Sequence, residues 1–258
     1  MMNTNLQVTK LISFLTILLL IGSCASKKEI VYFQDASNFE TMVDKNSFEP
    51  KFKVDDVISI FVSTLDNEAS IPFNLFRGGT EDGIRPEQVN YIVDSHGEID
   101  FPVIGKVKIA GLSPEETRIL LRERLSDYLR NPIINIRLTN FTITILGEVS
   151  RPGTYPVNGE RITILEGLGL AGDLTIKGQR ENVMVIRDFD GTKVYNRVDL
   201  TSKELLSSPV YYLTQNDVVY VEPNQSAVTA SSLDNRASIA VSIASVLITS
   251  AVLILSRN

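Results

Sequence analysis

Residues 113–138 read SPEETRILLRERLSDYLRNPIINIRL, and the neighbouring elements can be placed outward from them. Ser113 stands three residues before Glu116 with Pro114 between them, which predicts a capping box at the start of a helix. Apolar residues then recur at helical spacing, at Leu121, Leu125, Tyr128 and Leu129. Asn131-Pro132 ends this helix, and alternation beyond it predicts a half-buried strand with Ile134, Ile136 and Leu138 inward.

The sequence before this helix predicts short strands separated by turns. Residues 58–62 (ISIFV) are expected to form a strand, and so are residues 51–54 (KFKV), with Asp55-Asp56 between them. The segment 66–90 carries glycine, proline and acidic residues without periodicity, so a long loop is expected there. Further short strands are expected at 91–94, 99–101 and 105–110.

A second unit follows, and it opens with the apolar run FTITIL at residues 141–146. Residues 151–155 (RPGTY) predict a tight turn, because proline fixes φ and glycine accepts a positive φ. Thr163 and Glu166 predict a second capping box, which starts a short helix that stops at Gly172. Alternation predicts strands at 183–187, 193–197, 210–213 and 218–221.

The N-terminal residues have the layout of a secretory signal peptide. An apolar run at 11–22 (LISFLTILLLIG) follows Lys10 and precedes small residues. Ile21-Gly22-Ser23-Cys24 resembles the lipobox of bacterial lipoproteins, in which the cysteine sulfur carries diacylglycerol. Cys24 is therefore expected to be a lipid anchor, and an ordinary signal peptide with a chance cysteine is the alternative. Residues 25–49 are polar and predict a tether.

A second membrane signal lies near the C-terminus. Residues 237–256 (ASIAVSIASVLITSAVLILS) are uncharged, and a helix of that length is about 30 Å long, which matches the hydrocarbon core of a bilayer. Hydroxyl residues follow one face of that helix at the 3.5-residue period: Ser238, Ser242, Ser245 and Thr249. This hydroxyl stripe predicts helix packing through small residues.

Composition argues against several function classes. The net charge of −6 and the absence of a basic cluster disfavour nucleic-acid binding. His96 is the single histidine and Cys24 the single cysteine, so zinc sites and nucleophilic triads are not expected. The paired acids Asp55-Asp56 and Glu115-Glu116 are interpreted as turn and helix-start residues. The GxGxxG pattern at 167–172 follows a capping box rather than opening a helix, so no nucleotide cofactor is predicted.

Several longer segments resemble one protein family. Residues 51–138 resemble the polysaccharide biosynthesis/export domain of Wza-type outer-membrane polysaccharide export proteins, through FKVDDVISIFV, YIVDSHGEIDFPVIGKVKIAGLSPEET and YLRNPIINIRL. Residues 141–223 resemble a soluble-ligand-binding β-grasp domain, through ITILGEVSRPGTYPV, ITILEGLGLAGDL and LTQNDVVYVEP. Several relatives carry more than one β-grasp repeat, whereas this chain has one.

The resemblance implies an α+β fold in which a small export α/β domain precedes one β-grasp domain and a C-terminal transmembrane helix. The expected organisation is a lipoprotein signal peptide (1–23), a tether (24–49), the export domain (50–139), the β-grasp domain (140–224), a linker (225–236) and the transmembrane helix (237–256). In the turn at 151–155, Arg151 and Tyr155 either position the following strand or contact glycan directly. For the hydroxyl stripe, the resemblance implies an alternative to helix packing, in which the hydroxyls line a pore.

The function implied by the resemblance is non-enzymatic. The expected protein is an outer-membrane lipoprotein that assembles as a homo-oligomer ring and exports capsular or exopolysaccharide, with its soluble domains in the periplasm and no catalytic residue, metal or cofactor. Its expected partners are the polysaccharide, an inner-membrane polysaccharide co-polymerase and an outer-membrane barrel, without nucleic acid. The alternatives are a membrane-anchored glycan-binding scaffold that forms no pore and an enzyme acting on polysaccharide, for which no acid/base constellation is placed.

Overall fold

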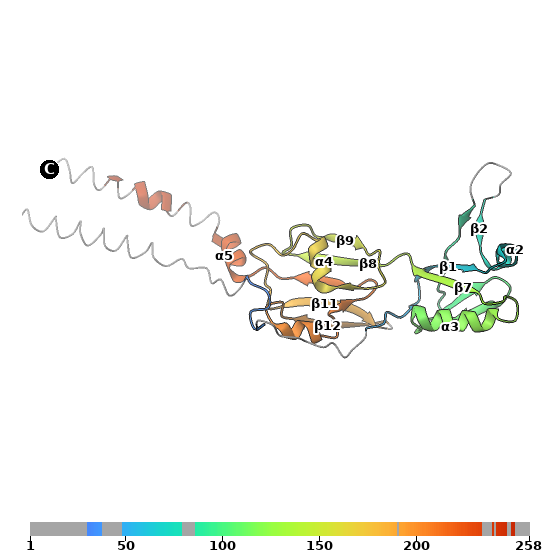
Figure 1. Cartoon of the computed structure of the whole chain (residues 1–258). Helices are drawn as coiled ribbons and strands as arrows, with labels where there is room; N and C mark the ends of the chain where they lie inside the picture. The colour runs from blue at the N-terminus through green and yellow to red at the C-terminus, as the bar shows by residue number, and fades with distance from the viewer. Residues whose placement is uncertain are drawn as a thin grey trace, which may run out of the picture.

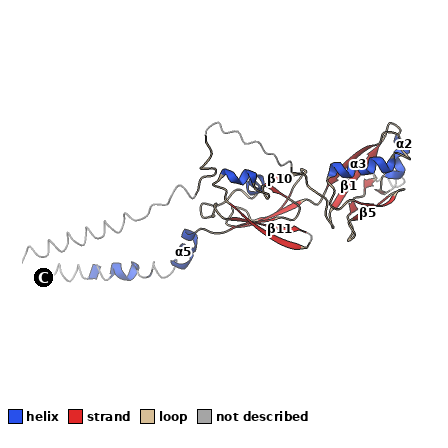
Figure 2. Cartoon of the chain, turned by 90° about the horizontal axis from the view of Figure 1, so that it is seen from below, coloured by secondary structure: helices blue, strands red, loops and turns tan. Residues whose placement is uncertain are grey.

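The computed structural model describes residues 30–37, 48–78, 86–189 and 191–233, together with 239, 241–246 and 249–250. These residues form a mixed α/β structure with two hydrophobic cores, one on each side of residue 139. Figures 1 and 2 show the two units end to end, which agrees with the two separate cores. We call them the export unit and the β-grasp unit, after the domains that the sequence resembles.

The export unit is built around strand β1 and helix α3. Its elements are β1 (Val57–Ser63), α2 (Asn67–Ser70), the 3-10 helix η2 (Ile71–Phe73), β2 (Phe76–Arg77), β3 (Glu87–Gln88), β4 (Tyr91–Ile92), β5 (Glu98–Phe101), β6 (Gly105–Lys108), α3 (Pro114–Leu125) and β7 (Ile133–Leu138). The antiparallel sheet β4-β1-β7 places Ile58 opposite Leu138 and Ile60 opposite Ile136. The buried Leu121 and Leu125 of α3 belong to the same core. The predicted start of the helix at Ser113 and the predicted strand are confirmed, but α3 ends at Leu125, before the predicted end at Asn131-Pro132.

The β-grasp unit wraps a mixed sheet around one short helix. Its elements are β8 (Thr142–Gly147), β9 (Gly153–Pro156), β10 (Ile162–Thr163), α4 (Ile164–Leu170), β11 (Val183–Phe189), β12 (Thr192–Val198), the 3-10 helix η4 (Lys203–Ser207), β13 (Tyr212–Leu213), β14 (Val218–Val221) and α5 (Gln225–Leu233). The five-stranded sheet has the order β12-β11-β14-β8-β9, and β14 runs parallel to β8. Ile164 and Leu168 of α4 are buried in the same core as Ile143 and Ile145 of β8.

Gly147 shows why one residue of this sheet must be glycine. Its φ is +89°, and a Cβ at this position would lie 2.0 Å from the carbonyl oxygen of Val221 on the parallel neighbour β14. Any larger side chain would push the two strands apart where they pair. The glycine therefore permits the parallel pairing of β8 with β14.

Three further expectations about local structure differ from what the structure shows. Residues 51–54 are not a strand, because Asp55 takes a positive φ of 68° and the Asp56 carboxylate accepts from the Lys53 N–H at 2.8 Å, which makes a turn. The predicted loop at 66–90 contains α2, capped by the Asp66 carboxylate, and the paired strands β2 and β3; residues 79–85 lie outside the described part. Residues 225–233 of the expected linker form α5.

Part of the expected tether is docked on the β-grasp unit. The backbone N–H groups of Phe33 and Gln34 donate to the carbonyls of Leu200 and Thr201, at 3.3 and 2.7 Å. The Asp35 carboxylate accepts from the Lys203 N–H at 2.7 Å and from the Ser202 hydroxyl at 2.8 Å. These hydrogen bonds fix residues 33–35 to the segment that follows β12, so this stretch is not a free linker.

A tyrosine secures the same segment from its other side. The Tyr32 hydroxyl donates to the Asp173 carboxylate, and the Arg180 guanidinium lies 5.6 Å from the centre of the Tyr32 ring. Burial and the bond to the Asp173 carboxylate raise the pKa of the Tyr32 hydroxyl well above its ordinary value. Residues 30–37 are therefore held by side chains as well as by backbone.

The two capping boxes predict how stability depends on pH. Hydrogen bonds from the Ser113 and Thr163 backbone N–H groups lower the pKa values of Glu116 and Glu166 below their ordinary value of 4.5. A carboxylate with a lowered folded-state pKa adds stability above its unfolded pKa, and this stability is lost as pH falls through the folded pKa. We therefore expect the urea midpoint to fall between about pH 6 and about pH 3.

The control for this pH dependence is a double variant. Glutamine can complete a capping box without titrating, so Glu116→Gln with Glu166→Gln should make the fall with pH shallower. The midpoint is measured by circular dichroism across the pH range. A slope identical to that of the wild type would contradict a role for these two carboxylates.

The C-terminal residues are described only in part. Residues 239, 241–246 and 249–250 are helical. Within the described part of the chain, no helix combines the length and the apolar character that crossing a membrane requires. The predicted transmembrane helix at 237–256 includes residues outside that part, so it stays a prediction.

Candidate functional site

The junction between the two units is the site to which both contribute side chains. Only residues 139–141 separate β7 from β8. The Asn140 side chain accepts from the Val57 N–H at 2.9 Å and donates to the Asp55 carbonyl at 3.1 Å. The Asn140 carbonyl in turn accepts from the Gln215 side chain at 2.6 Å. One residue of the connection is thus bonded to both units.

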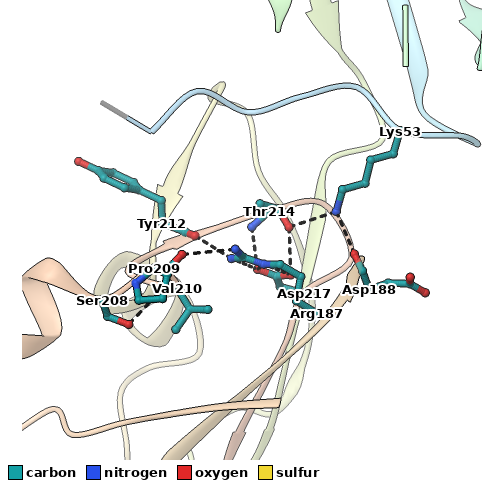
Figure 3. A network of polar contacts seen from close by, with 9 residues as sticks. All are labelled: Lys53, Arg187, Asp188, Ser208, Pro209, Val210, Tyr212, Thr214 and Asp217. Atoms are coloured by element: carbon teal, nitrogen blue, oxygen red, sulfur yellow. Dashed lines mark hydrogen bonds and ion pairs between the residues drawn. The ribbon is translucent and has the colours of Figure 1, made fainter. Parts of the chain in front are cut away.

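Apolar packing and a cation strengthen this junction. Leu138 packs against both hydrophobic cores. From the export unit, the Lys53 ammonium group reaches the Asp188 carbonyl and the Thr214 hydroxyl, each at 3.4 Å (Figure 3). The contacts come from the turn before β1, from β11 and from the loop before β14. They restrict rotation between the two units.

A buried ion pair fixes the β-grasp side of the junction. Arg187 on β11 binds the Asp217 carboxylate through two nitrogens, with Nη2 at 2.7 Å and Nε at 3.0 Å from its oxygens. The Asp217 side chain is fully buried and the Arg187 side chain is 14% exposed. Arg187 also donates to the Tyr212 carbonyl at 2.9 Å (Figure 3). This bidentate geometry is the strong form of a charged hydrogen bond.

The ion pair is linked directly to the Lys53 contact. The Asp217 carboxylate accepts from the Thr214 N–H at 2.8 Å and from the Thr214 hydroxyl at 3.0 Å. That hydroxyl is the group that the Lys53 ammonium approaches (Figure 3). The chain of contacts Arg187–Asp217–Thr214–Lys53 therefore runs from the middle of one unit into the other. These contacts are structural, and they join the two units.

The structure places the predicted site residues of the turn at 151–155 in structural roles. Arg151 donates to the Leu170 carbonyl at 3.2 Å, and the Tyr155 hydroxyl donates to the Arg151 carbonyl. Both side chains thus connect the turn to its own strand and to the end of α4. A glycan contact from either residue stays a prediction.

The residues of the predicted membrane segments are only partly described. Cys24 and Ser238 lie outside the described residues. The hydroxyls of Ser245 and Thr249 donate to the carbonyls of Ser242 and Ser245, at 2.8 and 2.7 Å. These bonds satisfy the two hydroxyls within their own helix.

The motifs considered for catalysis occupy structural positions. Gly172 has a φ of +76° and ends α4, while a Cβ on Gly167 would approach Ile143 to 2.9 Å. His96 lies in the turn between β4 and β5, where its N–H donates to Asp94. Burial raises the pKa of the Asp56 carboxyl. Among the residues that the structure describes, no three acids, histidines or cysteines are grouped to hold a metal ion.

Sequence reasoning did not identify Lys53, Arg187 or Asp217 as partners. The one local signal was the segment Thr214-Gln215-Asn216-Asp217, in which an aspartate three residues after a threonine forms a turn before a strand. Asn216 has a positive φ of 65°, which agrees with that turn. Arg187 on β11 and Lys53 in the export unit are distant in sequence from this segment, so no local sequence pattern predicts that they contact it.

Family models match both units. The model described as polysaccharide biosynthesis/export protein matches residues 45–139, and the SLBB domain model matches residues 142–196. The boundary between the two matches falls at the junction described above.

Two curated proteins are similar to part of the chain. The EPS I polysaccharide export outer membrane protein EpsA of Ralstonia solanacearum is 25% identical over 144 residues, which cover 54% of this chain and 38% of that protein. The protein of the same description from Ralstonia nicotianae is 27% identical over 109 residues, covering 41% of this chain and 29% of that protein. The matches thus span well under half of each relative.

Proposed function

The chain belongs to the Wza-type family of polysaccharide export proteins, and on this premise we propose that it serves in the export of capsular or exopolysaccharide across the outer membrane. The matched relatives are named for polysaccharide export and for the outer membrane. The proposed role is transport without catalysis. The driving force would come from polymer synthesis and from an inner-membrane co-polymerase.

One observation carries the proposed arrangement at the membrane. Residues 30–37 and α5 lie at the same end of the β-grasp unit, because Arg180 contacts both Tyr32 and the Gly178 carbonyl, and Gly178 pairs with Pro223 just before α5. This end lies away from the export unit (Figure 1). The lipid on Cys24 and the helix at 237–256 would therefore hold that end to a single membrane. The export unit would point into the periplasm.

The rigid junction supports assembly into a ring. A conduit wall needs subunits that keep one shape while many copies pack side by side, and the Lys53, Asn140 and Asp217 contacts supply that stiffness. We propose that copies of the two-unit body surround the path of the polysaccharide, with an outer-membrane barrel as a further partner. The alternative is a membrane-anchored scaffold that binds glycan and forms no pore.

The export role is tested by deleting the gene and measuring surface polysaccharide. Loss on deletion and recovery with the wild-type gene are expected. Unchanged surface polysaccharide in the deletion strain would contradict the proposed function.

The hydroxyl stripe gives a second test, directed at the C-terminal helix. Leucines at Ser242 and Thr249 add bulk where helices approach or where glycan passes, so export should fall while the protein stays membrane-bound. Leucines at Ala244 and Ala251 have the same seven-residue spacing and lie on the opposite face of an ideal helix. Surface polysaccharide is measured in both double variants. Equal export would show that the helix is only an anchor.

A further inference from the structure

A cleft lies at the junction of the two units. It is lined by residues from the segment before β1, from the start of α3, from β7 and from the β9–β10 connection. Its volume is about 320 Å³, within the range of small-molecule sites in proteins. Interfaces between domains are where such sites are most often found. The cleft is thus a candidate site to which both units contribute.

Apolar groups form part of the cleft wall. Phe52 and Ile136 are buried core residues that reach the cleft, and Leu138 lies beside them. Pro50 and Pro114 are half-buried and present rigid apolar surfaces. Faces of this kind suit the C–H groups of a sugar ring, which need apolar contact without a hydrogen-bond partner.

Four exposed polar side chains complete the lining. Lys51 and Arg137 come from the export unit, while Asn158 and Glu160 come from the β-grasp unit. Within the described residues, none of the four side chains forms a hydrogen bond, and the Lys51 ammonium has the Glu116 carboxylate as a charged neighbour. By contrast, the polar groups of the adjacent junction, such as Asn140, are bonded on several sides. The four groups can therefore bind a molecule without breaking hydrogen bonds in the fold.

The charges of these four groups favour an anion. Two are cations and one is a carboxylate, in a chain whose net charge is −6. An Arg guanidinium binds a carboxylate with two parallel N–H bonds, and a Lys ammonium adds a second charge. Asn158 and Glu160 offer an amide and acceptor oxygens, which suit hydroxyl groups.

A second cleft adjoins the first. A neighbouring cleft of about 300 Å³ shares Pro50, Pro114 and Glu160 with it. Two adjoining hollows with common walls can hold consecutive units of a chain molecule. A polymer segment therefore fits the shape better than an isolated small ion.

We propose that this cleft binds a carboxylate-bearing sugar residue of the exported polymer, such as a uronic acid. Arg137 and Lys51 bind the carboxylate, Asn158 and Glu160 bind hydroxyls, and the proline faces contact the ring. The proposal rests on the proposed export function, and it names the chemical class of the polysaccharide.

The test is a titration of the full-length protein with sodium D-glucuronate, D-glucose and acetate, followed by saturation-transfer NMR in a detergent without sugar headgroups. The wild type should bind glucuronate about tenfold more tightly than glucose or acetate. Lys51→Ala with Arg137→Ala should remove that preference. Arg122→Ala with Lys177→Ala, which removes one Arg and one Lys outside the cleft, should keep it.

Three results would overturn the proposal. They are equal binding of glucose and glucuronate by the wild type, binding of acetate as tight as that of glucuronate, and an unchanged preference in the Lys51→Ala, Arg137→Ala variant. Failure here is distinguishable from failure of the export role, because recovery of surface polysaccharide by the wild-type gene does not depend on which sugar the cleft prefers.

Discussion

Replacing Asp217 with alanine is expected to destabilise the β-grasp unit by about 3–5 kcal/mol. The substitution leaves the Arg187 guanidinium buried without its carboxylate, and removing one partner of a buried pair costs far more than the pair itself is worth. It also removes the acceptor of the Thr214 N–H and hydroxyl. The free energy of unfolding is measured by urea denaturation of the full chain, followed by circular dichroism.

The matched control is an exposed ion pair on the same hairpin. Lys193 pairs with Asp188, and their side chains are 58% and 41% exposed. Lys193→Ala should therefore change the free energy of unfolding by no more than about 1 kcal/mol. If Asp217→Ala were no more destabilising than Lys193→Ala, the buried Arg187–Asp217 pair would not be important for the stability of this unit.

Replacing Cys24 with serine is expected to remove nearly all function in the cell. Without the thiol no lipid can be attached, so the precursor should keep residues 1–23 and the protein should be lost from the outer membrane. Membrane attachment through acyl chains scales with the number of buried CH₂ groups, so a chain without the lipid loses that attachment. Membrane fractionation, mass spectrometry and surface polysaccharide report these three effects.

The control substitution is Ser26→Ala, which lies just beyond the lipobox and should leave processing and export unchanged. Mass spectrometry of the mature wild-type protein should show a lipid on Cys24. An unmodified cysteine in that protein would contradict the lipoprotein assignment.

Local sequence patterns predicted the helices and strands that are determined by residues close together in the sequence. The helices α3 and α4 were placed by capping boxes, and the structure shows both halves of each box. Strand β7 was placed by alternation, because its Ile134 and Ile136 are buried while Asn135 is exposed. These features need only residues a few positions apart.

Contacts between distant residues explain what the sequence did not predict. Residues 51–54 looked like a strand by alternation, but a turn at Asp55 and Asp56 prevents one. Residues 33–35 looked like a tether because their partners lie near residue 200. The junction was not predicted for the same reason, since Lys53 and Thr214 are 161 residues apart in the sequence.

We propose that copies of the two-unit chain assemble around a path for polysaccharide. The most direct test is the mass and negative-stain image of the full-length protein purified in mild detergent. We expect closed rings with a central lumen, of a mass many times that of the 28.6 kDa chain. Strict monomers, or small assemblies without a lumen, would contradict this account and favour a scaffold that forms no pore.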